Sequence, residues 1–292
     1  MKNKVVVLSH GFVSVHPNPA GIVHFIGGYF FGTGVQCWYR SLLEQLQQRF
    51  TVHSYSYSFA ELSHWKIASD LLAQIEQVKQ EAIRTGQQMG FQTEVYSDPS
   101  QHCLVGHSLG CECIALIRFL GFEKQVQLEL LKDAQRELGT REVTSADFTD
   151  VQSLPQSQHI PYRTSLCMAP CFKTPTAISG LLKVRPQDQL VQYLIQHKGA
   201  DLLPLTSLIF FSGDTIASPD VSWLQAELQQ QERLLNFDQI DVQRKYLTAL
   251  QYHMIPAFDP IDSGLAAIGS QFVSQLIGAS AIDHRTALIL DR

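Results

Sequence analysis

Short β-rich runs alternate with helical patterns along most of this chain, and this alternation limits the fold more than any other feature. Between most of the predicted strands, apolar residues recur with the spacing of one helical face, as in Leu109–Leu120. Strands that alternate with helices pair with one another in parallel, and the helices form the right-handed crossovers between them. We therefore expect an α/β fold, with a mostly parallel central sheet and helices on both of its faces. The predicted strands are Lys4–Ser9, Gly21–Ile26, Thr51–Tyr57, His102–Gly106, Thr164–Ala169, Thr206–Ser212 and Ile240–Leu247.

The 292 residues contain no internal repeat and no Gly/Ser-rich or Pro-rich linker, so we expect a single domain over residues 1–292. Residues 121–162 depart from the alternation because they are rich in Gln and charge, and only Gln125–Leu138 has a helical pattern. We expect this segment to be an insertion over the sheet edge. Two interpretations are open: a cap-like lid, or a solvated surface excursion without a functional role.

Composition and charge exclude several functional classes. A hydrophobic fraction of 45% with 17% charged residues is typical of a globular chain with a sizeable core. The chain has 22 Lys and Arg against 27 Asp and Glu, a net charge of −5, and it has no block of like charges that could follow a phosphate backbone. Nucleic acid is therefore not an expected partner.

The N-terminal residues and the cysteines favour a cytoplasmic protein without a transmembrane segment. The apolar run Val5–Leu8 is shorter than the roughly 7 to 15 residues of a signal-peptide core. The stretch Ile22–Phe31 is interrupted by polar and glycine residues, and a membrane span needs about 20 residues. Most cysteines lie in apolar runs, as free buried thiols do in a reducing compartment. Their spacing does not match a zinc site, so we expect neither a metal nor an organic cofactor.

The pentapeptide Gly106-His107-Ser108-Leu109-Gly110 has the pattern G-x-S-x-G and lies between an apolar strand and an amphipathic helix. A nucleophile elbow requires this order of strand, sharp turn and helix. The two glycines leave room for a strained turn, from which the serine Oγ would project above the sheet. The alternative is an ordinary turn whose serine caps the helix. We interpret Ser108 as a candidate nucleophile.

A nucleophilic serine needs a base, which in this architecture follows both the serine and the acid along the chain. His253 is the best candidate because it follows the last strand signal, Asp241–Leu250, and precedes the last helical pattern. It should then lie at the carboxyl end of a strand, where sites gather in open α/β sheets. The alternative interpretation of this residue is a half-buried histidine bonded to backbone. The less suitable candidates are His159, His197 and His284.

The acid must orient the imidazole and stabilise its protonated form. No Asp or Glu occurs between Val151 and Gln187, so the loop after the strand Thr164–Ala169 cannot supply it. Asp214 follows the next buried strand through a Gly-Asp turn and is the preferred candidate. Asp220 is the second candidate, although its place in the first turn of a helix already explains it.

The negative charge on an attacked carbonyl oxygen needs preorganised donors, worth on the order of 3 kcal/mol each. The Leu109 N–H at the start of the helix is one candidate. The loop after the strand that ends at Ile26 offers the amides of Gly28 and Tyr29 as the second. The competing His10-Gly11-Phe12 segment follows the first strand instead, and we interpret it as a turn.

With these residues assembled, the chain resembles the α/β-hydrolase superfamily and, more narrowly, the DUF1350 family. The resemblance implies an α/β-hydrolase fold with a cap-like insertion and a serine-hydrolase apparatus, without a substrate. The residues that carry it are Val23–Gly32, Tyr39-Arg40, Leu42-Leu43-Glu44, the pentapeptide Gly106–Gly110, Asp214 with Ile216, and His253 before Pro256.

These observations together predict a serine hydrolase, such as an esterase, thioesterase or lipase-like enzyme. Its substrate would be an acyl ester of a small or lipid-like molecule, cleaved through Ser108, Asp214 and His253 without a cofactor. Two alternatives stay open because a fold does not fix a function. One is a catalytically silent scaffold that binds a ligand or a partner, and the other is acyl transfer by the same triad.

Overall fold

The computed structural model describes residues 3–8, 11–29, 31–58, 61–156, 162, 164–172, 184–211, 218–231, 234–240 and 273. The strands are β1 (Lys4–Leu8), β2 (Gly11–Val15), β3 (Ile22–Ile26), β4 (Thr51–Tyr55), β5 (His102–His107), β6 (Thr164–Met168), β7 (Leu205–Phe211) and β8 (Leu234–Ile240). The α-helices are α1 (Val35–Trp38), α2 (Arg40–Leu46), α3 (His64–Met89), α4 (Leu109–Leu120), α5 (Lys124–Leu138), α6 (Ser145–Ser153), α8 (Asp188–Leu202) and α9 (Ser218–Gln230). The 3-10 helices are η1 (Phe31–Gly34), η2 (Glu94–Ser97) and η3 (Pro99–Gln101).

The described strands form one mixed sheet in the order β1-β2-β4-β3-β5-β6-β7-β8. The pairs β1–β2 and β2–β4 are antiparallel, and all the other pairs are parallel. Every residue of β3, β4, β5 and β6 is buried. Parallel strands that are covered on both faces are rich in apolar residues, which is why these runs were recognisable in the sequence although they also bury polar side chains. The expected α/β class with a mostly parallel sheet is confirmed.

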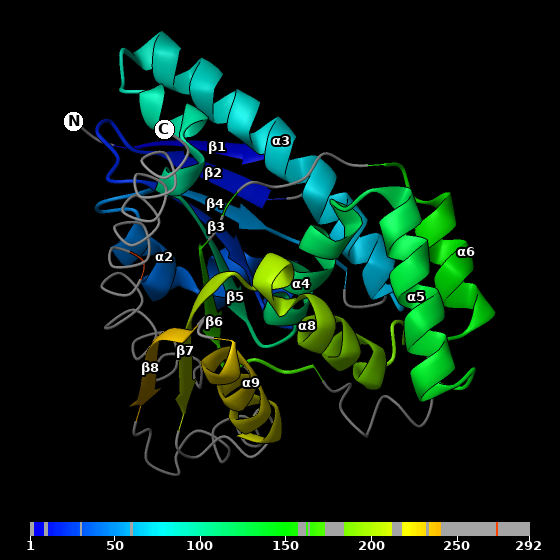
Figure 1. Cartoon of the computed structure of the whole chain (residues 1–292). Coiled ribbons are helices and arrows are strands. Elements are labelled where there is room, and N and C mark those ends of the chain that lie inside the picture. Colours follow the sequence, from blue (N-terminus) through cyan, green and yellow to red (C-terminus); the bar gives the residue numbers. More distant parts are fainter. Residues whose placement is uncertain are drawn as a thin grey trace, which may run out of the picture.

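Helices cover both faces of this sheet, as predicted. Helices α3, α4, α8 and α9 lie on one face, and α2 lies on the other (Figure 1). The alternation of side chains along β3 divides the core accordingly. Ile22 and Ile26 pack in the apolar cluster of α3 and α4, whereas Val23 and Phe25 pack with α1 and α2.

Two strands differ from the sequence-based prediction. Gly11 and Phe12 begin the strand β2 and do not form the predicted turn. A Cβ atom on Gly11 would lie 2.1 Å from the Ser54 carbonyl oxygen, so the glycine permits close pairing with β4. The last described strand, β8, ends at Ile240, the residue at which the prediction began it. Residues 241–250 lie outside the described residues.

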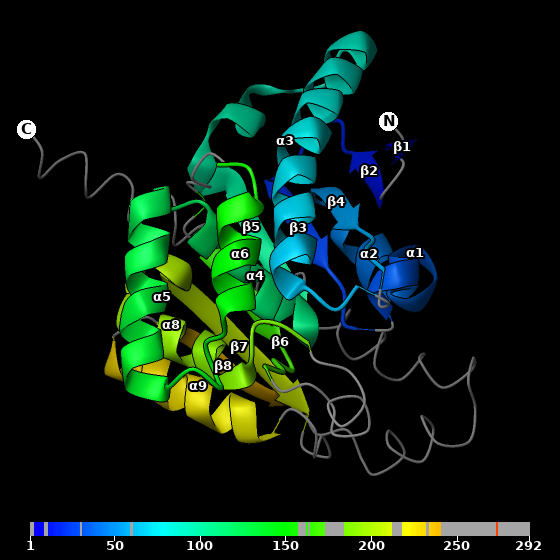
Figure 2. The ribbon, with the colours of Figure 1, turned by 90° about the vertical axis from the view of Figure 1, so that its right-hand side faces the viewer.

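The described part of the insertion at residues 121–162 contains two helices, of which only α5 was predicted. Figures 1 and 2 show α5 and α6 side by side, outside α3 and α8. A capping box between Thr144 and Asp147 starts α6. Trp65 on α3 donates its Nε1–H to Asp147 Oδ1 at 3.0 Å, and this bond is buried. The insertion is therefore attached to α3, and its motion as a lid stays a prediction.

Three buried histidines on neighbouring strands form a cluster under α3, which we call the histidine cluster: His24 on β3, His53 on β4 and His102 on β5. His24 Nε2 lies 2.9 Å from His102 Nδ1, and the Tyr162 ring stacks on both imidazoles. Burial lowers the pKa of His53 and His102 to about 3 and holds the pKa of His24 well below its ordinary value. The cluster is therefore neutral at neutral pH.

All six cysteines lie in the described part of the chain. All six cysteines are free, and five of them are buried. Across the described residues, no group of three His, Cys, Asp or Glu side chains could hold a metal ion. No helix in the same part of the chain has the length and hydropathy of a membrane span.

Candidate active site

Ser108 lies on the turn between β5 and α4 with φ 53° and ψ −120°. A positive φ at a serine costs on the order of 1–3 kcal/mol and persists only where the surroundings impose it. The Ser108 side chain makes no hydrogen bond that caps α4, although the residue is in the N-cap position. The structure therefore contradicts the alternative of an ordinary turn with a capping serine. The order of strand, sharp turn and helix is the expected one.

The glycines on either side of Ser108 allow this turn to approach its neighbours. A Cβ atom on Gly110 would lie 2.2 Å from the carbonyl oxygen of Ile26, at the end of β3. A Cβ atom on Gly106 would lie 2.7 Å from Cys111 N and from the Gly110 carbonyl group. Both contacts are with backbone, which cannot move aside as a flexible side chain can. The pentapeptide therefore needs glycine at both positions for packing.

The loop after β3 passes directly beside the serine. A Cβ atom on Gly28 would lie 3.0 Å from Ser108 Cβ and 3.1 Å from His107 Nδ1. The pairing of Ile26 with Gly106 in the parallel sheet produces this approach, because it aligns the ends of β3 and β5. Gly28 is thus brought next to Ser108, and the role predicted for this loop in binding an oxyanion stays a prediction.

The Gly28 amide is engaged in a buried hydrogen-bond network. Its N–H donates to Tyr39 Oη at 2.9 Å, and Tyr39 Oη lies 2.8 Å from His107 Nδ1. Burial lowers the pKa of His107 to about 4, so its imidazole is neutral at neutral pH. We assign Tyr39 Oη as the donor of this hydrogen bond and His107 Nδ1 as its acceptor, which leaves the imidazole proton on Nε2.

A second tyrosine fixes the same loop from the end of β4. Tyr57 Oη donates to the Gly27 carbonyl oxygen at 2.8 Å. The ring of Tyr57 is so close to Gly32 that a Cβ atom there would lie 2.5 Å from the ring. Neither tyrosine was predicted to have a role at the site, because Tyr39 entered only the family resemblance and Tyr57 ended a predicted strand. Only the sheet register brings them to the loop.

Replacing Tyr39 by Phe is expected to lower the free energy of unfolding by about 2 kcal/mol. The change removes one hydroxyl and leaves the Gly28 amide and His107 Nδ1 buried without this partner, and each such loss costs about 1–3 kcal/mol before relaxation. Urea denaturation followed by circular dichroism measures the difference. A variant as stable as the wild type would show that the network is not formed in solution.

The loop after β6 supports the serine turn from the other side. Ser108 N donates to the Met168 carbonyl oxygen at 2.9 Å, and Cys171 N donates to the Ser108 carbonyl oxygen at 3.4 Å. Ala169 follows β6 with φ 44°, and it shares a positive φ with Ser108 alone among the described non-glycine residues. Two strained residues therefore lie on adjacent strand ends, as is common at functional sites.

The two acid candidates differ in what the structure describes. Asp220 is buried in the first turn of α9 and accepts a hydrogen bond from Phe172 N at 2.9 Å. It thereby holds the loop after β6, which agrees with its expected role in a helical first turn. Asp214 lies outside the described residues, three positions after the end of β7 at Phe211.

The predicted base lies outside the described residues as well. His253 is 13 positions beyond the end of β8, and the alternative candidates His159 and His284 are also outside. His197 is exposed on α8, where its Nδ1 lies 2.9 Å from the Tyr193 carbonyl oxygen. The described structure therefore places Gly28 and Leu109 beside Ser108 and does not include the base.

A buried pair of ionisable groups connects α3 to the helix that follows Ser108. His64 Nδ1 lies 2.8 Å from Glu112 Oε1, and both side chains are 3% exposed. Glu112 is in the first turns of α4, where the helix dipole favours a carboxylate. Sequence reasoning missed this pair, because nothing in the spacing of residues 64 and 112 indicates a contact. The pair fixes the start of α3 beside the serine turn.

The sheet order and the serine turn after β5 define the chain as an α/β-hydrolase fold. A candidate carboxylesterase from Lactobacillus plantarum WCFS1 is 15% identical, with a TM-score of 0.54 over 97% of this chain and 99% of that chain. A sugar hydrolase (YeeB) from Lactococcus lactis is 11% identical, with a TM-score of 0.52 over 98% of this chain and 99% of that chain. These likenesses establish the fold.

A family model also matches the chain. Residues 6–128 match the family described as "Protein of unknown function (DUF1350)". This match covers the loop after β3 and the pentapeptide, and it confirms the resemblance predicted from those residues. No curated protein matches the sequence.

Proposed function

We propose that this protein is a serine hydrolase that cleaves an acyl ester of a small or lipid-like molecule. The observation that carries the proposal is the turn at Ser108, which lies beside the loop at Gly28. Ser108 has a positive φ, and its side chain does not cap α4. A strained serine at a strand-to-helix turn is the arrangement of a nucleophile elbow. The esterase-like fold supports the proposal without identifying a substrate. The buried free thiols are consistent with a reducing compartment, and we propose the cytoplasm.

In the proposed mechanism, Ser108 Oγ attacks the acyl carbonyl carbon while His253 accepts the hydroxyl proton. Collapse of the tetrahedral intermediate breaks the ester bond, and His253 returns the proton to the leaving alcohol. Water then attacks the acyl-serine while His253 accepts a proton from it, and His253 returns this proton to Ser108 Oγ as the bond to the acyl group breaks and the acid is released. Asp214 accepts a hydrogen bond from His253 and stabilises its imidazolium form.

The oxyanion would be bound by two backbone amides, those of Leu109 and Tyr29. Leu109 is the first residue of α4, so its N–H has no acceptor within the helix and the helix dipole favours an anion there. The Gly28 N–H was the other candidate in the loop after β3, but it donates to Tyr39 Oη. We therefore assign the second donor to Tyr29 and a positioning role to Gly28.

The acid assignment is testable by comparing two aspartates. Asp214→Asn is expected to lower kcat for 4-nitrophenyl acetate by about 10⁴-fold, because the amide cannot hold the imidazole in the required tautomer. Asp220→Ala is expected to lower the melting temperature instead, because Phe172 N loses its acceptor. The reverse pattern, in which Asp220→Ala abolishes turnover while still folded and Asp214→Asn keeps the wild-type kcat, would assign the acid to Asp220.

Hydrolysis of 4-nitrophenyl esters of increasing acyl length tests the activity itself. The proposal predicts saturable release of 4-nitrophenol that depends on Ser108. Product analysis with added alcohols separates hydrolysis from acyl transfer, since a transferase would form the new ester. An absence of turnover with every ester, together with a ligand that raises the melting temperature, would support the silent scaffold and contradict the proposal.

A further inference from the structure

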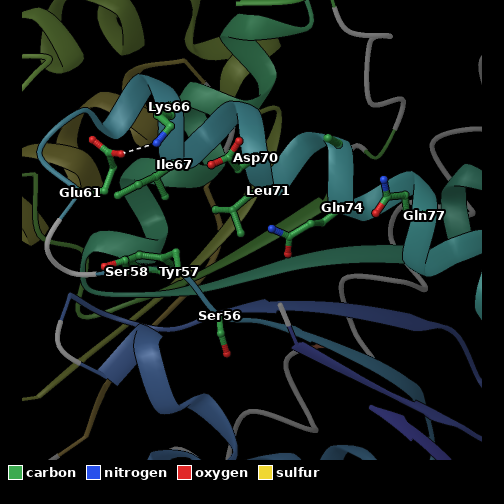
Figure 3. Close-up of a pocket in the computed structure, with 11 residues that line it drawn as sticks. Ser56, Tyr57, Ser58, Glu61, Lys66, Ile67, Asp70, Leu71, Gln74 and Gln77 are labelled. Atoms are coloured by element: carbon green, nitrogen blue, oxygen red, sulfur yellow. Dashed lines mark hydrogen bonds and ion pairs between the residues drawn. The ribbon is translucent and has the colours of Figure 1, made fainter. Parts of the chain in front are cut away.

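A cavity of about 470 Å³ lies between α3 and the segment that follows β4. We call it the α3 cavity; its lining includes Tyr57, Glu61, Lys66, Leu71, Gln74 and Gln77. Figure 3 shows Leu71 and Gln74 extending from α3 toward the strands, with Glu61 and Lys66 at one end. Its volume is within the range of ligand sites, roughly 300–1,000 Å³.

The α3 cavity adjoins the candidate active site through one side chain. Tyr57 lines the cavity, and its hydroxyl donates to the Gly27 carbonyl oxygen at 2.8 Å. The next residue, Gly28, abuts Ser108, where a Cβ atom would lie 3.0 Å from Ser108 Cβ. The wall formed by α3 is held to the serine turn by the buried pair of His64 and Glu112. A molecule in this cavity would therefore lie one loop away from the nucleophile.

The lining combines an apolar floor with neutral polar groups. Tyr57, Ile67 and Leu71 are buried and form the apolar part. Gln74 and Gln77 follow on α3, and each carboxamide can both donate and accept hydrogen bonds. A hydroxyl group also donates and accepts, whereas an alkyl chain does neither. An alkyl chain that covered these carboxamides would remove their hydrogen bonds to water and would offer no hydrogen bonds in return.

The charged groups of the lining are concentrated at one end, where Glu61 and Lys66 form an ion pair. Lys66 Nζ lies 2.7 Å from Glu61 Oε2, and Asp70 lies on the same stretch of α3. An anionic ligand would meet two carboxylates against one ammonium that is already bonded. A cationic ligand would find Glu61 already bonded to Lys66 and only the solvent-exposed Asp70 as a counter-charge, which contributes little. The cavity is therefore best matched by an uncharged molecule with several hydroxyl groups and an apolar ring face for Tyr57.

We propose that the α3 cavity binds the alcohol part of the ester when that alcohol is a sugar or another uncharged polyol. The inference rests on the proposed function for its link to Ser108. The alcohol would lie against Tyr57 with its hydroxyls on Gln74 and Gln77, while the ester carbonyl reaches Ser108 past Gly28. The substrate class is then an acylated sugar or polyol.

Two acetate esters of matched shape test the preference. In 6-O-acetyl-D-glucose and cyclohexylmethyl acetate, a six-membered ring carries the same acetoxymethyl group with and without hydroxyls. We expect the wild-type protein to have a kcat/KM at least tenfold higher for the sugar ester. In the double variant Gln74→Leu, Gln77→Leu this ratio should fall by about tenfold. The matched control, Gln87→Leu with Gln88→Leu on the exposed last turn of α3, should keep the wild-type ratio.

Binding to the Ser108→Ala protein separates the cavity from catalysis. Saturation-transfer NMR should detect 6-O-acetyl-D-glucose on this protein, and the signal should be lost when Gln74→Leu and Gln77→Leu are added. Binding without turnover by the wild type would contradict the proposed function and support the cavity. Turnover of 4-nitrophenyl acetate without sugar binding would overturn the cavity proposal and leave the hydrolase intact. A preference for acetylcholine over the sugar ester would also overturn it.

Discussion

Ser108→Ala is expected to lower kcat for 4-nitrophenyl acetate by about 10⁴-fold or more, because no other atom can form the acyl intermediate. The fold should survive the change. Ser108 Oγ makes no capping hydrogen bond to α4, and alanine has the same backbone restriction at φ 53° as serine. The melting temperature should therefore stay close to that of the wild type, so the loss of turnover reports chemistry and not unfolding.

The matched control for this prediction is Ser97→Ala, a serine on the exposed surface of η2. This variant should keep the wild-type rate. If Ser108→Ala retained more than a tenth of the wild-type kcat, the nucleophile would be a different residue, and the strained turn would have a structural role only.

Acidification from pH 7.5 to pH 5 is expected to lower the free energy of unfolding by about 4 kcal/mol through His53 and His102 alone. Their folded pKa values of about 3 are below the ordinary value of 6.5. Above pH 6.5 both states are neutral and the groups have no effect. As pH falls below 6.5, these two histidines bind protons in the unfolded chain, whereas in the folded chain they stay neutral down to about pH 3. This difference lowers the free energy of unfolding by about 2 kcal/mol per group at pH 5. Desolvation is the main cause, and Lys79 disfavours a charge on His102 as well.

Urea denaturation at several pH values measures this loss, and one substitution isolates its source. His53 Nε2 has no hydrogen-bond partner among the described residues, so His53→Leu should be tolerated at pH 7.5. This variant should lose about 2 kcal/mol less than the wild type on acidification. His16→Leu, outside the histidine cluster, is the control and should lose as much as the wild type. An unchanged pH dependence in His53→Leu would show that the buried imidazoles do not limit acid stability.

The fold was predictable because its central strands carry apolar residues on both faces of the sheet. The runs at β3, β5 and β6 are local signals that survive without knowledge of their neighbours. Strand β2 was not predictable in the same way. Its first residue, Gly11, is a typical turn residue, and only its approach to Ser54 in the folded sheet gives that glycine a place in a strand.

In the candidate site, too, the local features were predictable and the contacts between distant segments were not. The turn at Ser108 is specified by five consecutive residues, so the sequence predicted it. The network of Tyr39, His107 and Gly28 joins three segments that meet only when β3 and β5 are in register. The pair of His64 and Glu112 depends in the same way on how α3 packs against α4. Such contacts across elements carry no sequence spacing that would reveal them.

Labelling by a fluorophosphonate, with the modified peptide identified by mass spectrometry, tests whether Ser108 is an activated nucleophile. The reagent reacts covalently with an activated serine, so the test needs no knowledge of the substrate. We expect one phosphonyl group on Ser108 in the native protein and none in Ser108→Ala, in His253→Gln or after denaturation. Absence of labelling in the folded wild-type protein, or labelling at another serine, would contradict this expectation.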